Sequence, residues 1–316
     1  MLDIAKAGLG DDEVGLIDET MLAIPEVTGI HPLTGQSLPG VADARPIAGT
    51  TYKTSVRVEL PSVTFRDLNE GTAYTKQRKE NRTVNCYRAN PKWAVDKDAG
   101  DENSTVAELL ADEAAAHVMA YMQALGRGFF YGTNTTFGIG AKGFQGLLQQ
   151  YDASNMTVDA TGDTADGCSS VWAVSFGTQS VRWVSGQNGR HEITDPREGD
   201  ATDANGREFT AMKQEMYAHA GLQVGSQLQV ARIKNLTAQS GKTLTGDMLG
   251  ELIQKFKLSY RPQVIFAPKR CIEQYRQNLQ SVTSSPVRVS TPYDFETIPL
   301  VPTESLTATE PVNLAA

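Results

Sequence analysis

One stretch limits what this chain can fold into more than any other. Residues 104–126, STVAELLADEAAAHVMAYMQALG, have the spacing of a single long helix. Thr105 and Glu108 match the T-x-x-E capping box, in which each residue satisfies a free backbone N–H of the other. Gly126 predicts the end of the helix. At 1.5 Å per residue such a helix is about 33 Å long, which is the span of a small domain.

The chain is acidic, with a formal net charge of −8 and a pI near 5.1. Because nonspecific binding of nucleic acid needs a basic surface that displaces counterions, this charge argues against it. The start of the chain does not resemble a signal peptide, and nowhere do 18 apolar residues follow one another. Cys86, Cys168 and Cys271 lie far apart without a C-x-x-C, which favours three reduced thiols.

The segment 1–49 is predicted to be an extended arm. Pro25, Pro32, Pro39 and Pro46 recur at intervals of seven, and glycines lie between them, so long helices and central strands are excluded. The segment nevertheless contains more apolar residues than a disordered tail would. We therefore expect the arm to lie on another surface, such as that of a neighbouring subunit.

Residues 50–93 are predicted to form a long hairpin. TTYKTSVRVEL alternates as a strand with one polar face, and RTVNCYRA at 82–89 is the expected return strand. The segment between them is highly charged and has little apolar material for a core of its own, so the hairpin must project and find partners elsewhere. A basic cluster lies near its end and comprises Lys76, Arg78, Lys79 and Arg82. These side chains either form a solvated tip or contact carboxylates of a neighbouring subunit.

The rest of the chain mixes short strands and helices. Strands are expected at 171–176 and 180–185, and a longer pair at 207–224 and 226–236 with a turn at Gly225 and Ser226. The remaining segments are two helices at 247–260 and 269–280, a buried strand at 262–268 between prolines, and a closing strand at 295–306. This mixture of helices and strands predicts an α+β fold.

A glycine-rich segment, FGIGAKGFQGLL at 137–148, contains a literal G-x-G-x-x-G. A dinucleotide site needs a strand before the glycines and a helix after them, whereas here they follow a long helix. We therefore expect Gly138, Gly140, Gly143 and Gly146 to permit backbone bends and close approach.

Other motifs for chemistry are incomplete. SGKT at 240–243 lacks the first glycine of a phosphate-binding loop, and HEITD at 191–195 has Asp195 where a zinc protease has its second histidine. The four histidines, which have no metal-ligand spacing, are His31, His117, His191 and His219. The sequence predicts no catalytic residues, no cofactor and no metal, and hence no enzyme.

The order of these parts resembles that of major capsid proteins of tailed bacteriophages with the Hong Kong 97-type fold. Within that group the chain is most similar to the capsid proteins of short-tailed, epsilon15-like phages. FFYGTN at 129–134, GFQGLL at 143–148 and MYAHAGLQVGSQLQVARIKNL at 216–236 carry that similarity. The resemblance implies an N-terminal arm at 1–49, an E-loop hairpin at 50–93, a P-domain at 94–236 with its spine helix at 104–126, and an A-domain with the closing strand at 237–316.

The resemblance also implies a function. The chain would assemble with copies of itself, as pentamers and hexamers, into the icosahedral head shell of a phage, and would be located in the virion and, during assembly, in the host cytoplasm. Scaffolding and portal proteins are expected partners, with a decoration protein as a further one, and packaged DNA would be enclosed without sequence-specific binding. No membrane contact, N-terminal maturation cleavage or inter-subunit cross-link is predicted.

Two alternatives stay open at this point. One is a nucleotide-dependent enzyme that uses the glycine-rich loop at 137–148. The other is a different structural component of the virion, such as a decoration or tail-tube protein.

Overall fold

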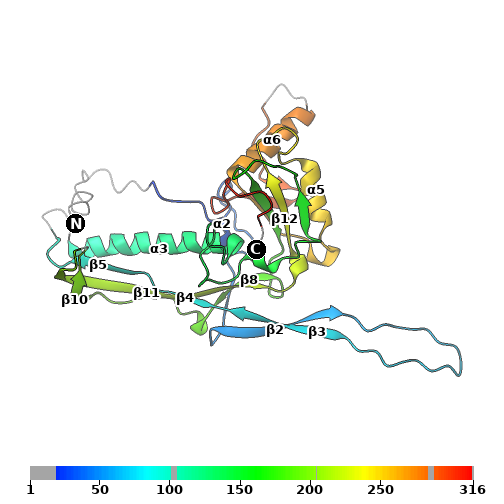
Figure 1. Cartoon of the computed structure of the whole chain (residues 1–316), viewed down its shortest axis with the longest axis horizontal. Helices are drawn as coiled ribbons and strands as arrows, with labels where there is room; N and C mark the ends of the chain where they lie inside the picture. The colour runs from blue at the N-terminus through cyan, green and yellow to red at the C-terminus, as the bar shows by residue number, and fades with distance from the viewer. Residues whose placement is uncertain (1–18, 101–104, 204, 284–287, 315–316) are drawn as a thin grey trace.

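The fold is described from a computed structural model, which covers residues 19–100, 105–203, 205–283 and 288–314 (Figure 1). The first 18 residues of the predicted arm and the first residue of the predicted helix therefore lie outside the described residues. In the described residues, two β-sheets, one long helix and four shorter α-helices make up the body, which confirms the predicted α+β fold. A two-stranded hairpin extends away from this body.

The first sheet has seven strands arranged around one long central strand. Its members are β1 (Ala44–Pro46), β4 (Tyr87–Ala89), β5 (Lys92–Asp96), β8 (Val181–Ser185), β9 (Glu192–Ile193), β10 (Arg197–Thr202) and β11 (Glu208–Val224). Every one of them except β1 pairs directly with β11, and β1 lies parallel to β8.

The second sheet has six strands in the order β14-β15-β13-β7-β12-β6. Their bounds are β6 (Thr157–Asp159), β7 (Ser169–Val174), β12 (Val230–Leu236), β13 (Val264–Ala267), β14 (Asp294–Phe295) and β15 (Ile298–Pro302). Helices α5 (Gly246–Gln254) and α6 (Lys269–Thr283) pack against this sheet through a shared apolar cluster, and Figure 1 shows both beside β12. Strand β13 is buried at every residue, as the proline-bounded apolar run predicts.

The long helix α3 (Val106–Tyr131) lies along β11, as Figure 1 shows. It begins as predicted, because the Thr105 hydroxyl accepts a hydrogen bond from the Glu108 backbone N–H at 3.3 Å and the Glu108 carboxylate accepts one from the Thr105 N–H at 2.7 Å. An apolar cluster that includes Leu110 of α3 and Met216 of β11 joins helix and sheet.

The helix continues to Tyr131 rather than ending at Gly126, so the predicted end was wrong by five residues. Gly126 does not end the helix, but allows the side chains of other segments to approach the helix closely. A Cβ atom there would lie 2.4 Å from both a Glu26 carboxylate oxygen and the Ser305 hydroxyl. The last turn then carries Phe129 and Phe130 into the apolar cluster that both sheets share.

One sequence expectation about the sheets was wrong. Strands β11 and β12 lie within the expected ranges 207–224 and 226–236, but β11 belongs to the seven-stranded sheet and β12 to the six-stranded one, so they are not a hairpin. A short 3-10 turn, Gln227–Gln229, lies between them and allows the chain to change sheets. For the same reason the expected boundary between 236 and 237 divides a sheet, because β12 shares it with β13 and β15. Helix α5 is also shorter than expected, since it ends at Gln254.

The described part of the arm packs on its own chain, whereas the expected contact with a neighbouring subunit stays a prediction. Helix α2 (Pro25–Thr28) buries Glu26 completely, and Leu38 and Val41 join the main core. The Glu26 carboxylate accepts hydrogen bonds from the hydroxyls of Thr303, at 2.8 Å, and of Ser305. Burial raises the pKa of Glu26 to about 7.

The glycine-rich turn after α3 has the role predicted for it. Gly140 has a φ of +82°, which favours glycine, and a Cβ atom on Gly146 would lie 2.5 Å from the Gly128 carbonyl oxygen. This close contact places Phe144, Leu147 and Leu148 in the core beside the end of the helix. The segment runs from α3 to α4 (Leu147–Gln150), with no strand before the glycines, so the arrangement of a dinucleotide site is not formed.

Gly146→Ala tests the close approach. The added methyl would overlap the backbone of α3, so we expect the free energy of unfolding to fall by about 2–3 kcal/mol. Gly250→Ala is the matched control, because Gly250 lies in α5 and a Cβ atom added there would have no atom within 4 Å, so alanine should stabilise the helix by up to about 1 kcal/mol. Denaturant unfolding of both variants measures the contrast, and equal effects of the two changes would contradict it.

Glu26→Gln tests the buried carboxyl. Because the pKa of Glu26 is raised from 4.5 to about 7 on folding, its contribution to stability is complete below about pH 4.5 and is lost as the pH rises to about 7. The glutamine variant should therefore become more stable than the wild type across this window, by about 3 kcal/mol at pH 8. Unfolding between pH 4.5 and pH 8 measures this, with Glu304→Gln, an exposed carboxylate nearby, as the control. Parallel stability curves for wild type and Glu26→Gln would rule the explanation out.

Candidate functional site

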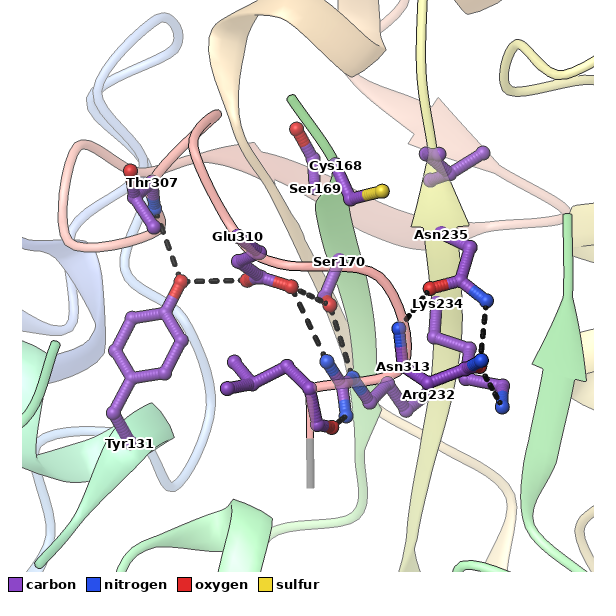
Figure 2. A network of polar contacts seen from close by, with 12 residues as sticks. Tyr131, Cys168, Ser169, Ser170, Arg232, Lys234, Asn235, Thr307, Glu310 and Asn313 are labelled. Carbon is purple, nitrogen blue, oxygen red and sulfur yellow. Dashed lines mark hydrogen bonds and ion pairs between the residues drawn. The ribbon is translucent and has the colours of Figure 1, made fainter. Parts of the chain in front are cut away.

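A group of charged and polar side chains is buried at the junction of α3, the six-stranded sheet and the C-terminal segment (Figure 2). Arg232 of β12 and Glu310 form an ion pair of 3.2 Å, and their side chains are only 2% and 1% exposed. The Ser170 hydroxyl donates to the same Glu310 oxygen at 2.5 Å, and Tyr131, the last residue of α3, donates to the other at 2.7 Å.

The Arg232 guanidinium is also fully engaged. Its Nε donates to the Ser170 hydroxyl at 2.9 Å, its Nη1 donates to the Leu314 carbonyl at 2.8 Å, and its plane lies 5.3 Å from the centre of the Trp172 ring. Burial, together with the adjacent Glu310, holds the pKa of Tyr131 well above its usual value, so this hydroxyl stays protonated and continues to donate. Each group thus contacts another member of the network, and the arrangement holds the C-terminal segment in place.

A second polar contact extends this attachment. Asn235 of β12 and Asn313 exchange two hydrogen bonds, with the Asn313 N–H donating at 2.8 Å and the Asn235 amide donating at 2.9 Å. Lys234 donates to the same Asn313 side chain at 2.7 Å. Lys234 and Asn235 lie in the sequence motif at 216–236. No local pattern indicates that they pair with Asn313, almost 80 residues later.

The surface candidate is the hairpin of β2 (Thr51–Glu59) and β3 (Arg78–Asn85), which confirms the predicted pairing. Figure 1 shows it projecting beyond the body, with the connecting loop farther out still. At its base, the Tyr52 hydroxyl donates to the Gln223 side chain of β11, and Arg45 lies 5.2 Å from the centre of the Tyr52 ring. The return strand begins at Arg78 rather than at Arg82, so the predicted basic cluster falls mainly within the strand.

The structure divides the four predicted contact residues into different environments. Arg82 is turned toward its own body, where it donates to the Gly225 carbonyl at 3.4 Å. Arg78 pairs within the hairpin, at 3.3 Å from Glu80 and 4.0 Å from Glu59. Lys76 and Lys79 are exposed and form no ion pair with any residue that the structure describes.

The outer face of the hairpin concentrates positive charge. Lys79 stands directly across from Arg57 in the register, and alternation places Lys53 on the same face. Like charges opposite each other destabilise an isolated strand pair. On the other face, Tyr52 is partly buried and Val84 fully buried against the body, whereas Val58 and Glu80 are exposed. A carboxylate surface on the outer face would therefore relieve the repulsion.

Sequence reasoning missed the apolar side chains of the hairpin loop. It treated the segment between the strands as polar, yet the structure leaves several large apolar side chains largely or fully exposed there: Leu60, Val63, Phe65, Leu68 and Tyr74. Exposed apolar groups gathered on one projecting element are typical of a contact surface. Their recurrence every few residues within the charged run was the signal that could have identified them.

The remaining sequence motifs form no reactive centre in the described ranges. Groups of three or more His, Cys, Asp or Glu side chains that could hold a metal ion are absent there. Cys86, Cys168 and Cys271 are free thiols and buried, and burial raises the pKa of Cys271 to about 12. None of the helices in the described part of the chain is long and apolar enough to cross a membrane.

Glu310→Gln tests the buried junction. The change keeps the shape of the side chain but leaves the Arg232 charge unpaired in the interior, so the free energy of unfolding should fall by about 3–5 kcal/mol. Combining Arg232→Met with Glu310→Leu removes both charges and should recover much of that loss. Denaturant unfolding of Arg232→Met, Glu310→Leu and the double variant measures the coupling, beside Glu310→Gln. Strictly additive losses would show that the two charges do not act as a pair.

Known proteins share this architecture. Residues 41–311 match the family model Major capsid protein GP7. The structure of bacteriophage Epsilon15 is similar, with a TM-score of 0.63 and 17% identity over 96% of this chain and 100% of that chain. The bacteriophage JBD30 capsid is also similar, with a TM-score of 0.53 and 10% identity over 87% of this chain and 93% of that one. No curated protein sequence matches.

The structural matches confirm the expected Hong Kong 97-type capsid fold. They offer no support for the alternative of a nucleotide-dependent enzyme. The family model spans well over half of the sequence. The chain belongs to the Major capsid protein GP7 family, and the predicted function as a phage major capsid protein is confirmed.

Proposed function

We propose that this chain builds the head shell by docking its hairpin on a neighbouring copy. The observation that carries the proposal is the hairpin itself, which has two strands, exposed apolar side chains at its loop and a basic outer face. A two-stranded hairpin is marginally stable in water on its own. The loop of this hairpin would therefore gain stability by packing on the surface of another copy.

Charge complementarity supports a second copy as that surface. Residues 51–85 contain seven basic and four acidic residues, a formal charge of +3, so the remainder of the chain carries −11. Opposite fields of this kind steer association and fix the register of an interface. Within the hairpin, Lys76 and Lys79 are the predicted residues left free for carboxylates of the neighbour, whereas Arg78 and Arg82 organise the hairpin from within.

The division into capsid domains follows as part of the proposal. We assign 1–49 to the arm, 50–93 to the E-loop, the spine helix and the β11 sheet to the P-domain, and the six-stranded sheet with α5 and α6 to the A-domain. The last assignment moves β6, β7 and β12 out of the range first expected for the P-domain. The same proposal keeps the other expectations. The chain would form pentamers and hexamers, assemble in the host cytoplasm with scaffolding, portal and decoration partners, and enclose DNA.

Charge reversal at the hairpin tests the docking. The double variant Lys76→Glu and Lys79→Glu should fold normally, because both side chains are exposed and unpaired, and its unfolding should change by no more than about 0.5 kcal/mol. Its assembly should require at least about tenfold more protein, since each misplaced charge opposes acidic groups. Light scattering and electron microscopy of particles formed with a scaffold measure this.

The matched control reverses two exposed basic residues outside the hairpin, Arg207→Glu and Lys257→Glu. This control should assemble closer to wild type than the hairpin variant does. Shells of normal yield from the hairpin variant would exclude these lysines as contacts. Persistent monomers of the wild type with scaffold supplied would count against shell formation itself.

A further inference from the structure

A pocket on the seven-stranded sheet combines cationic side chains with a buried, unpaired histidine. Its volume is about 300 Å³, and it is lined by Arg88, Gln187, Arg190, Tyr217 and His219. Arg88 of β4 and His219 of β11 stand directly across from each other in the register. Met216 and Ala218 contact α3, so strand alternation turns Tyr217 and His219 to the face away from that helix.

Arg88 is held in a geometry that suits an anion. Its guanidinium lies 4.4 Å from the centre of the Tyr217 ring, and it forms no ion pair with any carboxylate in the described part of the chain. Stacking on an aromatic ring occupies the face of a guanidinium and leaves the N–H groups at its edge, which match the two oxygens of a carboxylate or phosphate.

His219 supplies the buried polar group. The residue is 94% buried, and its Nδ1 atom makes no hydrogen bond to any described residue. Buried polar atoms are normally hydrogen-bonded, and this unpartnered one belongs to a residue that lines the pocket, so the pocket lacks a hydrogen-bond partner for His219. Burial, followed by the charge of Arg88, lowers the pKa of His219, and a nearby anion would oppose this effect.

The charge of the pocket remains positive after its own ion pairs are considered. Arg190 is already paired with Glu192, whereas Arg88 has only the Tyr217 ring. The nearby carboxylate of Glu215 is engaged by Lys92, at 3.4 Å, and by Arg197, at 2.7 Å. No carboxylate is among the residues that line the pocket.

We propose that this pocket is an oxyanion site, and that its occupant in the shell is a carboxylate of a neighbouring copy. The acidic remainder of the chain provides such groups, and the overall charge of −8 disfavours a nucleic-acid phosphate. The pocket as an oxyanion site stands on its own geometry, whereas the identity of its occupant rests on the proposed assembly.

The first experiment uses the unassembled subunit and inorganic phosphate at constant ionic strength. With only four histidines in the chain, the ring resonance of His219 can be assigned by comparison with His219→Asn. Phosphate should shift this resonance saturably in wild type and in the control Arg207→Gln, and at least about tenfold more weakly in Arg88→Gln. An unsaturable shift, or an equal one in Arg88→Gln, would overturn the oxyanion site.

The second experiment identifies the occupant in assembled shells. Arg88→Lys keeps the positive charge and allows a carbodiimide to form an amide with a carboxylate in direct contact. A cross-link from position 88 to an acidic residue of another copy, found by mass spectrometry, supports the neighbouring carboxylate. Intact shells with no such cross-link, in a protein whose pocket still responds to phosphate, would overturn that occupant and assign the site to a free anion. Failure to form shells at all would instead contradict the proposed function.

Discussion

The buried ion pair between Arg232 and Glu310 is the contact on which the rest of the body depends. Removing both charges from water costs several kilocalories per mole for each ion, and only a complete set of hydrogen bonds makes the arrangement tolerable. Ser170, Tyr131 and the Leu314 carbonyl supply that set. Because these groups come from a strand, the end of α3 and the C-terminal segment, their geometry requires all three to meet at one point.

This junction explains how one chain can have a compact body and a projecting hairpin together. Phe129 and Phe130, which directly precede Tyr131, belong to the apolar cluster that both sheets share, and the arm is attached to the C-terminal segment through Glu26. The hairpin lacks any comparable core and is attached mainly at its base by Tyr52 and Arg82. Such a division suits the proposed docking, in which the body would keep its shape while the exposed hairpin contacts a neighbouring copy.

The glycines show how a local pattern can mislead about chemistry and still be informative about structure. The G-x-G-x-x-G spacing matches a nucleotide motif, but Gly146 is required because it lies against the backbone of α3. Gly126, which predicted the end of the helix, is instead the place where the helix accommodates the Glu26 carboxylate. In both cases the residue type was interpretable from the sequence, whereas its contact came from a segment far away in the chain.

The sequence by itself determined the local elements: the capping box at Thr105, the hairpin strands and the buried strand at 264–267, since capping and periodicity depend on residues a few positions apart. Only the tertiary structure decided that β11 and β12 belong to different sheets, that the arm packs on its own chain, and that Arg232 meets Glu310. Those outcomes depend on burial and on pairing between distant segments, and no local spacing records them. The loop of the hairpin combines both kinds of information. Its apolar residues can be identified in the sequence, but only the tertiary structure shows that they are exposed.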